Sequence, residues 1–225
     1  MPMGWVMGDM VLLPNGDVLI INGAGLGTVG WELGRDPVMA LVAYCPDGVL
    51  RLRFKIQEKA RIPRMYHSSA VLLRDGRVLV GASNLHELSS FTKVLFPNEL
   101  SLEAFSPQYL DPTQLGLRPV VLDRKSSSTL KYGSLFRIKF SIARSLRPES
   151  IKITMIRLPF TTHSFSTSQR SHQYDAVNNH PDGLTVISNR GKDAQVYTHS
   201  STRLLYVICG PSGDVPNEGI WVQLL

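Results

Sequence analysis

The chain has 225 residues, of which 43% are hydrophobic and 19% are charged. This composition is typical of a packed globular protein and excludes a disordered chain. The formal net charge is +6, which permits binding to acidic polymers, but the basic residues are scattered and do not favour nucleic-acid binding. No apolar run is long enough to cross a membrane, and the first residues lack the basic start and unbroken apolar stretch of a signal peptide.

A hairpin pattern occurs twice near the start of the chain, at residues 10–20 (MVLLPNGDVLI) and 70–80 (AVLLRDGRVLV). Asn-Gly in the first copy and Asp-Gly in the second, each between apolar runs, predict a strand, a tight turn and a second strand. A unit that recurs after about 60 residues indicates a repeat architecture, and it is slightly longer than the roughly 50 residues of a kelch-type propeller blade, which it fits best. Two copies predict about two blades, whereas a closed propeller needs about four to eight, so we expect an incomplete propeller.

Each copy is expected to continue into a second hairpin. In the first unit the predicted strands cover residues 37–48 and 50–56, and in the second unit they cover 92–97 and 100–107. The proline-rich stretch 107–119 has no clean period, so we interpret it as a linker into a second domain.

Beyond the linker, residues 134–142 and 150–159 alternate strongly between apolar and polar side chains, and residues 183–188 and 219–225 also suit strands. Short antiparallel strands separated by turns are typical of an immunoglobulin-like β-sandwich. Residues 172–203 are weakly patterned, although a sandwich of this size should contain another alternating strand there.

No stretch keeps a 3.6-residue period over a dozen residues, so we predict an all-β chain with almost no helix. The predicted domains are a partial propeller of about two blades in residues 1–110 and an immunoglobulin-like sandwich in residues 111–225.

Tyr66, His67 and His163 form the candidate metal site. Phenolate oxygen and imidazole nitrogen suit a tetragonal copper(II) centre. Neighbouring strand residues point to opposite faces, so Tyr66 and His67 can share a metal only where the strand has not begun or is bulged. The apolar run starts at Ala70, which fits that position, and His163 lies in a Thr/Ser-rich stretch that suits a loop tip. Each side chain also has a purely structural explanation, as a packed aromatic, a hydrogen-bonded histidine or an exposed loop histidine.

Other chemistry finds little support in the sequence. Cys45 and Cys209 are consistent with one disulfide or with two buried thiols, and they belong to no zinc-binding pattern. The string GAGLGTVG is followed by no helix, which argues against a dinucleotide site. The remaining histidines have no ligand spacing and are interpreted as surface residues or local hydrogen-bonding groups; they are His86, His172, His180 and His199.

A resemblance to a known family rests on five stretches, which occur in the order MPMGWVMGDMVLLPNGDVLIINGAGLGTVGWE, IPRMYHSSAVLLRDGRVLVGASN, ELSLEAFSPQYL, PFTTHSFSTSQR and GIWVQL. Together they resemble the C-terminal half of plant aldehyde oxidases of the glyoxal oxidase-like family, which are relatives of galactose oxidase. The resemblance implies a copper radical oxidase built from a kelch propeller and an immunoglobulin-like early-set domain. Such enzymes oxidise an aldehyde or a primary alcohol and reduce dioxygen to hydrogen peroxide.

The resemblance also implies roles for individual residues. Tyr66 would be the axial tyrosinate and the base for the substrate proton, and His67 and His163 would be imidazole ligands of Cu²⁺. The family's fourth protein ligand is a second tyrosine linked to a cysteine; this Tyr–Cys radical cofactor lies in earlier blades and is expected to be absent from this chain. Cys45 and Cys209 do not lie in the family's cysteine motif.

We therefore interpret the chain as the C-terminal fragment of a copper radical oxidase that is inactive as this chain. A complete enzyme would have a small aldehyde or alcohol and O2 as its partners, and the resemblance implies an extracellular or cell-wall location. One alternative is a non-catalytic remnant whose positive charge binds acidic cell-wall polysaccharide. Another is an unstable truncated copy, because two blades leave sheet edges exposed. No nucleic-acid or membrane partner is expected.

Overall fold

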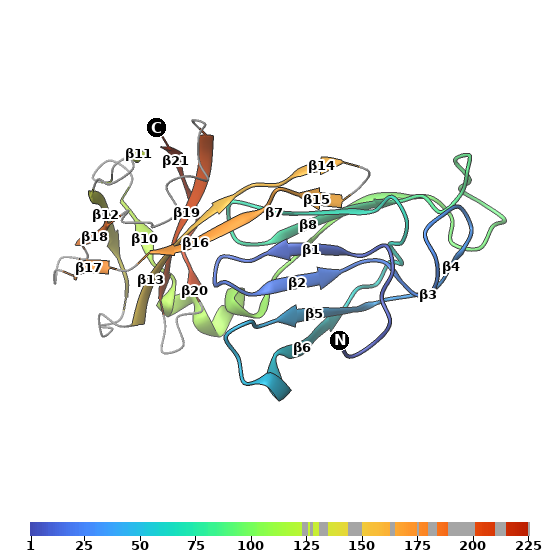
Figure 1. Ribbon diagram of the computed structural model, residues 1–225, viewed down its shortest axis with the longest axis horizontal. Helices are drawn as coiled ribbons and strands as arrows, with labels where there is room; N and C mark the ends of the chain where they lie inside the picture. Colours follow the sequence, from blue (N-terminus) through green and yellow to red (C-terminus); the bar gives the residue numbers. More distant parts are fainter. Residues whose placement is uncertain are drawn as a thin grey trace.

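The computed structural model describes residues 1–122, 126, 128–130, 135–143, 150–162, 165–174, 176–179, 184–188, 201–209 and 215–224. Within these residues the fold is all-β, which confirms the predicted class (Figure 1). The described helices are short 3₁₀ segments: η1 (Leu50–Leu52), η2 (Gln108–Leu110) and η3 (Pro112–Leu117). None of the described helices is long and apolar enough to cross a membrane.

The first hairpin pattern opens a four-stranded antiparallel sheet with the order β1-β2-β5-β6. Its strands are β1 (Asp9–Leu12), β2 (Val18–Ile21), β5 (Ala40–Tyr44) and β6 (Phe54–Lys59). Gly16 has a φ of +92° in the first turn, a conformation that glycine adopts without a side-chain clash. A separate small hairpin, β3 (Ala24–Gly27) and β4 (Gly34–Pro37), lies between β2 and β5 and was not predicted.

The second hairpin pattern forms a three-stranded antiparallel sheet with the order β7-β8-β9. Its strands are β7 (Ser69–Leu72), β8 (Val78–Ser83) and β9 (Glu99–Phe105). The predicted strand at residues 92–97 is wrong, because this segment is a chain of bends. Lys93 and Phe96 adopt positive φ values of 59° and 57°, which an extended strand does not contain. Leu95 is exposed, so burial of its side chain does not favour a strand there either.

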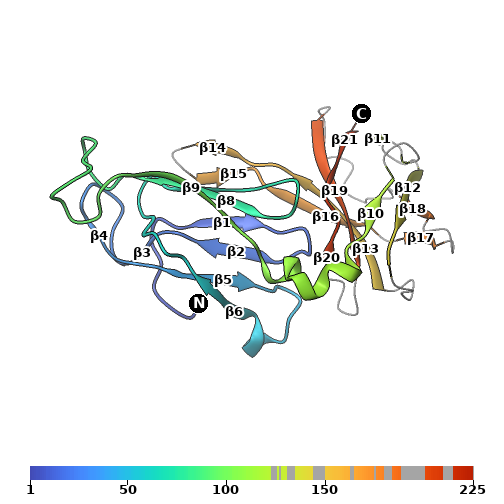
Figure 2. The same cartoon turned by 180° about the vertical axis from the view of Figure 1, so that it is seen from behind.

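Alternate side chains of these two sheets fill one shared hydrophobic core, as expected for adjacent propeller blades. The contributing residues include Val11, Leu19, Ile21, Ala70, Leu72, Val78 and Val80. The strands β1 and β7 contact each other, and the two sheets lie side by side in both views (Figures 1 and 2).

The second half of the chain is a β-sandwich. One sheet has the order β10-β12-β18-β17, and the other has the order β11-β21-β19-β13-β16, with β20 paired to β19. The strands are β10 (Val120–Val121), β11 (Thr129–Leu130), β12 (Leu135–Ser141), β13 (Ile151–Arg157), β16 (Arg170–Tyr174), β17 (Ala176–Asn179), β18 (Leu184–Ser188), β19 (Ser201–Cys209), β20 (Val215–Pro216) and β21 (Ile220–Leu224). All four predicted strands of this half are present, and β16 to β19 occupy parts of the weakly patterned region.

The strand β13 is buried on both faces, which explains how the two halves pack together. Ile153 and Met155 face the core of the sandwich, whereas Thr154 and Ile156 point the other way. Ile156 joins the core of the blades, and the hydroxyl of Thr154 donates to the carbonyl oxygen of Pro14 at 2.7 Å. One face of the sandwich therefore closes the end of the blade core.

A cluster of hydrogen bonds ties the β7–β8 turn to the second half of the chain. Each of the four carbonyl groups of residues 73–76 accepts a hydrogen bond from the linker or the sandwich. The Leu73 carbonyl accepts from the Tyr206 hydroxyl at 3.1 Å, and the Arg74 carbonyl accepts from the Gly219 amide at 2.8 Å. The Asp75 carbonyl accepts from the Arg118 guanidinium at 2.8 Å, and the Gly76 carbonyl accepts from the Tyr109 hydroxyl at 2.6 Å. Burial raises the pKa of both tyrosines, which keeps their hydroxyl groups protonated as donors.

Candidate metal site

Tyr66 and His67 occupy a turn that ends just before β7 begins at Ser69. The turn is closed by the Ser68 amide, which donates to the Met65 carbonyl at 3.2 Å, and His67 has a left-handed φ of 58°. Because the strand has not begun, the two side chains need not alternate. Their rings stack with centroids 3.8 Å apart and an angle of 26° between the planes, so the two side chains lie on the same side of the chain.

Arg64 anchors this turn to the second sheet. Its side chain is 3% exposed, and its guanidinium forms an ion pair with the Glu103 carboxylate at 3.1 Å. It also donates to the Ala82 carbonyl at 3.1 Å and to the Ser101 hydroxyl at 3.0 Å. The Arg64 guanidinium therefore holds the residues before the turn against β8 and β9.

Backbone hydrogen bonds fix the turn from both sheets. The Gly23 amide donates to the Arg64 carbonyl at 2.7 Å, and the Asn84 amide donates to the Tyr66 carbonyl at 2.8 Å. Tyr66 packs against a small apolar cluster that contains Met7, Ala24, Met65 and Leu85. Both Tyr66 and His67 remain half-buried, so their polar atoms are positioned by the fold without being sealed from solvent.

The hairpin β14 (Phe160–Thr162) and β15 (Phe165–Thr167) extends from the sandwich alongside β1 and β7 (Figures 1 and 2). The Ser166 hydroxyl donates to the Ala70 carbonyl at 2.7 Å. Ala70 follows His67 by only three positions, so the hairpin extends toward the end of β7 that carries the candidate ligands. His163, the third predicted ligand, lies outside the described residues.

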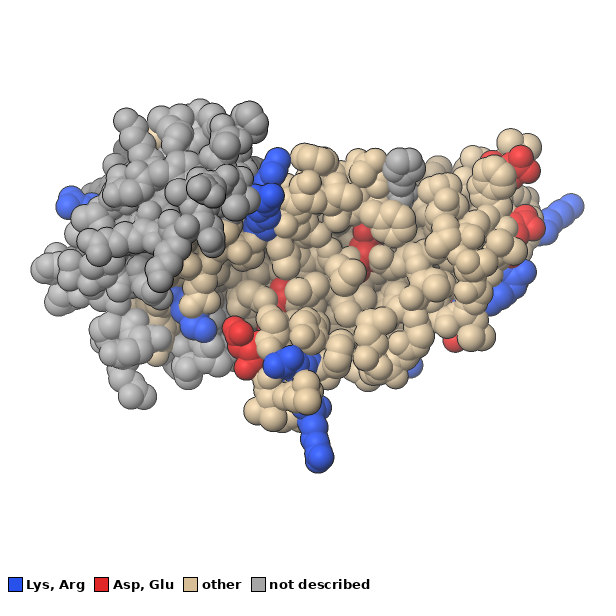
Figure 3. Space-filling model, viewed as in Figure 1, with Lys and Arg blue, Asp and Glu red and all other residues tan. Residues whose placement is uncertain are grey.

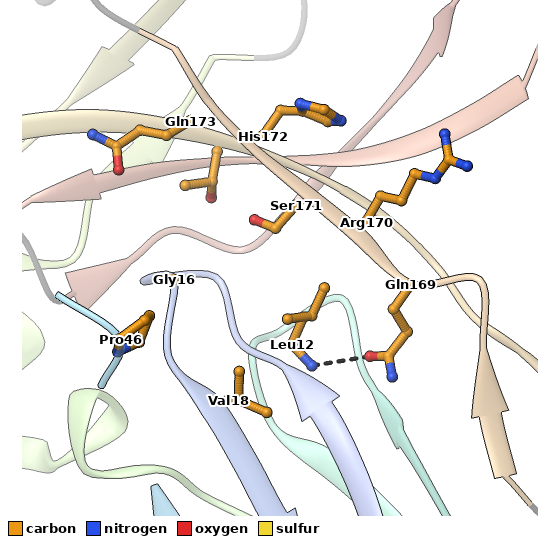
Figure 4. A pocket seen from close by; sticks show the side chains of 10 residues that line it. Leu12, Gly16, Val18, Pro46, Gln169, Arg170, Ser171, His172 and Gln173 are labelled. Atoms are coloured by element: carbon orange, nitrogen blue, oxygen red, sulfur yellow. Dashed lines mark hydrogen bonds between the residues drawn. The ribbon is translucent and has the colours of Figure 1, made fainter. Parts of the chain in front are cut away.

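Gln169 fixes the base of this hairpin to β1. Its side-chain oxygen accepts from the Leu12 amide at 2.9 Å, and its side-chain amide donates to the Met10 carbonyl at 2.5 Å. Figure 4 shows Gln169 at the edge of a pocket between the β1–β2 hairpin and β16, with the bond to Leu12 dashed. The side-chain amide of Gln169 thus makes the kind of pairing that a neighbouring strand would make with β1.

The described residues bring Tyr66 and His67 together and add no further cluster of metal ligands. In the part of the chain that the structure describes, no group of three or more His, Cys, Asp or Glu side chains could hold a metal ion. One phenol oxygen and one imidazole nitrogen fit two positions of a tetragonal copper(II) centre. The remaining ligands of such a centre would come from outside this pair.

The structure decides between alternatives that the sequence left open for two other residues. Cys45 is a free, half-buried thiol, so the disulfide with Cys209 that the sequence left open is not formed. His86 is 6% exposed, and its ring bonds the Glu32 carboxylate at 2.9 Å and the Phe96 carbonyl at 3.2 Å. It is thus a buried link between two loops that are distant in sequence rather than a surface group.

Sequence reasoning did not single out Arg64 or Gln169. Arg64 lies inside the quoted Tyr-His motif, and a lone arginine next to an apolar residue before a strand could have suggested a buried anchor. Gln169 carried no signal of its own, because its partners on β1 are more than 150 residues away in the chain.

Comparison with known proteins supports the resemblance. Residues 1–109 match the family Glyoxal oxidase N-terminus, and residues 118–224 match the family Galactose oxidase-like, Early set domain. The whole chain is 37% identical to Aldehyde oxidase GLOX1 of Arabidopsis thaliana and 42% identical to the putative aldehyde oxidase Art an 7 of Artemisia annua. It covers 36% and 37% of these two proteins, respectively.

The fold is also similar to a solved structure, a fungal alcohol oxidase in complex with copper. The TM-score is 0.77 at 19% sequence identity, and the match covers all of this chain and 43% of that one. The chain thus spans about two-fifths of the length of its relatives. The two halves of the chain thus match, in order, the domain families of glyoxal oxidase-like and galactose oxidase-like proteins, and together these matches cover nearly all of its length.

Proposed function

We propose that this chain is the C-terminal, copper-binding part of a copper radical oxidase that oxidises aldehydes or primary alcohols with O2 to give H2O2. The observation that carries this proposal is the Tyr66–His67 turn, which stacks a phenol on an imidazole beside a hairpin from the sandwich. The aldehyde oxidases and galactose oxidase among its relatives support the substrate class. An extracellular or cell-wall location is part of the same proposal.

Each residue then has a distinct task. Tyr66 would hold the copper ion through its phenolate oxygen, which would also be the base that accepts the substrate proton. His67 would supply an imidazole nitrogen, and His163, which lies outside the described residues, would supply a second one. When bound, copper supplies the one-electron redox chemistry, and Arg64 keeps the Tyr66–His67 turn in place for it.

Copper binding by the purified chain tests this assignment. Titration calorimetry with copper(II) is expected to show one site that weakens by about 100-fold or more in His67→Gln, because a direct ligand is lost. Tyr66→Phe should also weaken the site. His199→Gln is the matched control and should bind like the wild type. An unchanged affinity in His67→Gln would reject the proposed site.

We also propose that these 225 residues alone do not turn over. A two-electron oxidation at one copper ion needs a second redox centre, and neither Cys45 nor Cys209 lies in the family's Tyr–Cys motif. The test is a peroxide assay on the copper-loaded chain with glyoxal and with a primary alcohol. Hydrogen peroxide above the level of a His67→Gln control would show that this part of the proposal is wrong.

A second candidate function is binding to acidic cell-wall polysaccharide, which the net charge of +6 favours. Lys and Arg do not gather into one patch on the face shown in Figure 3, so a single polyanion-binding surface is not evident there. Retention on a polygalacturonate column at 150 mM salt would favour this function, and elution in the void volume would argue against it.

A further inference from the structure

Asp9 is a buried carboxyl group at the start of β1 that the proposed chemistry does not use. Its side chain is 2% exposed. The Asn22 side-chain amide donates to its Oδ2 atom at a long 3.4 Å, and its Oδ1 atom makes no hydrogen bond of good geometry with any described residue. A buried carboxylate with so little support is unfavourable, because burial removes its hydration without replacing it.

The β14–β15 hairpin is a neighbour of this carboxyl group, because β15 contacts β1, the strand that Asp9 begins. The backbone amide of Ser166 on β15 lowers the pKa of Asp9, because it stabilises the charged form. Asn22 directly follows β2, the strand that pairs with β1, whereas Ser166 belongs to a two-stranded hairpin that reaches in from the sandwich. If Asp9 needs water, the hairpin is therefore the element whose displacement can admit it.

The sequence repeat shows that the blade pattern does not itself require a carboxyl group here. Aligning residues 10–20 with 70–80 places Asp9 in the position of Ser69. Both residues begin the first strand of their sheet, and both of these strands contact β15. A neutral serine serves at this position in the second blade, so the carboxyl group in the first blade needs another explanation.

Burial raises the pKa of Asp9 to about 6, and the Asn22 and Ser166 amides offset part of this rise. Among the described residues no Lys, Arg, His, Asp or Glu side chain contributes to the shift; the groups that do contribute, the Asn22 and Ser166 amides, are neutral. The carboxyl group is thus neutral in mildly acidic solution and charged above it, without a cation to balance the charge.

We infer that Asp9 is a positioning residue for the proposed copper site: its neutral carboxyl group lets the β14–β15 hairpin seat fully against β1, and its ionised form loosens that hairpin. Gln169 bonds the base of the hairpin to β1, so the loosening inferred here concerns the hairpin strands beyond Gln169. The inference rests on the proposed function only in its effect on copper binding. The seating of the hairpin is a property of the metal-free chain.

Hydrogen exchange of the metal-free chain between pH 5 and pH 8 tests this inference. Protection factors, corrected for the intrinsic exchange rate, are compared for peptides covering residues 160–169 and 78–83. In the wild type, hairpin protection is expected to fall about tenfold from pH 5 to pH 8. The pKa of Asp9 is raised while the hairpin is closed and returns to its ordinary value when the hairpin opens, so ionisation of Asp9 favours the open state. Protection of residues 78–83 should change much less.

Two variants complete the design. In Asp9→Asn the hairpin protection should stay high and independent of pH, and in Asp47→Asn, an exposed turn residue, it should follow the wild type. If Asp9→Asn does not fold, the comparison of the wild type with Asp47→Asn still decides. Flat protection in the wild type, or an equal fall at residues 78–83, would overturn the inference.

Copper titration of the same samples separates this inference from the proposed function. The copper affinity of the wild type, relative to Asp9→Asn, is expected to fall as the pH rises from 5 to 8. Normal copper binding with flat hairpin protection would reject the role of Asp9 alone. A pH-dependent hairpin in a chain that binds no copper would reject the copper site, and with it the positioning role of Asp9.

Discussion

The hydroxyl of Ser166 donates a hydrogen bond to the carbonyl oxygen of Ala70 at 2.7 Å, although the two residues lie 96 positions apart in the chain. The bond joins the sandwich hairpin to the strand that begins directly after the Tyr66–His67 turn. The placement of the hairpin relative to the candidate ligands therefore depends on contacts between the two halves of the chain.

Ser166→Ala is expected to destabilise the seated hairpin by about 1 kcal/mol, the usual net contribution of one such hydrogen bond. The copper affinity should fall about fivefold for the same reason. Thr167→Val is the matched control, because the Thr167 hydroxyl bonds only the Phe160 carbonyl within the hairpin. Equal effects of both variants on copper affinity would show that the Ser166–Ala70 bond has no special role.

Tyr206→Phe should lower the free energy of unfolding by about 1 kcal/mol, because the hydrogen bond to the Leu73 carbonyl is lost at the junction of the two halves. Urea unfolding measures the change. Tyr44→Phe is the control, since the Tyr44 hydroxyl makes no hydrogen bond with any described residue, and its removal should change stability by less than about 0.5 kcal/mol. A loss in Tyr206→Phe no larger than that of the control would contradict the assignment.

Arg64→Met should destabilise the chain by about 3 kcal/mol, because the guanidinium is buried and makes several charge-assisted hydrogen bonds. Glu103→Gln should have a smaller effect, because the Glu103 side chain is 40% exposed and its charge is partly hydrated. A double-mutant cycle gives the coupling between them.

Arg77→Met is the control for this prediction, since it removes a surface ion pair with Asp75 and should have little effect. Arg64→Met should also weaken copper binding in conditions where the chain is fully folded. Copper affinity equal to that of the wild type would mean that Arg64 stabilises the fold without positioning the Tyr66–His67 turn.

The raised pKa of Asp9 predicts a pH dependence of stability. A carboxyl group with a pKa of about 6 in the folded chain and about 3.8 in the unfolded chain stabilises the fold fully below pH 3.8 and loses that contribution as the pH rises through 6. The free energy of unfolding of the wild type, relative to Asp9→Asn, should fall by about 2 kcal/mol from pH 4 to pH 8. A constant difference would mean that the Asp9 pKa is not raised.

Local pattern was sufficient to predict much of the fold. The hairpins of β1–β2 and β7–β8 follow from apolar alternation around Asn-Gly and Asp-Gly, and the same reasoning places Tyr66 and His67 before a strand. The segment 92–97 has a similar apolar pattern but lies on a largely exposed loop, where no described strand pairs with it. The predicted strand at residues 50–56 is wrong at its start, because residues 50–52 form a 3₁₀ turn and β6 covers only Phe54–Lys59.

The features that position the site could not be predicted because they depend on contacts between distant segments. The burial of Asp9, the Arg64–Glu103 ion pair and the bonds of Gln169 to β1 each join residues whose pairing exists only in the folded chain. Local sequence contains no signal for such partners. Candidate ligands could be predicted from residue chemistry, whereas the groups that hold them could not.

The central claim is that Tyr66 and His67 share one copper ion, and pulsed EPR of the copper(II)-loaded chain tests it most directly. The wild type should show modulation from the remote nitrogen of coordinated imidazole, and this modulation should be reduced in His67→Gln and retained in His199→Gln. A copper spectrum that is identical in the wild type and His67→Gln would contradict the account.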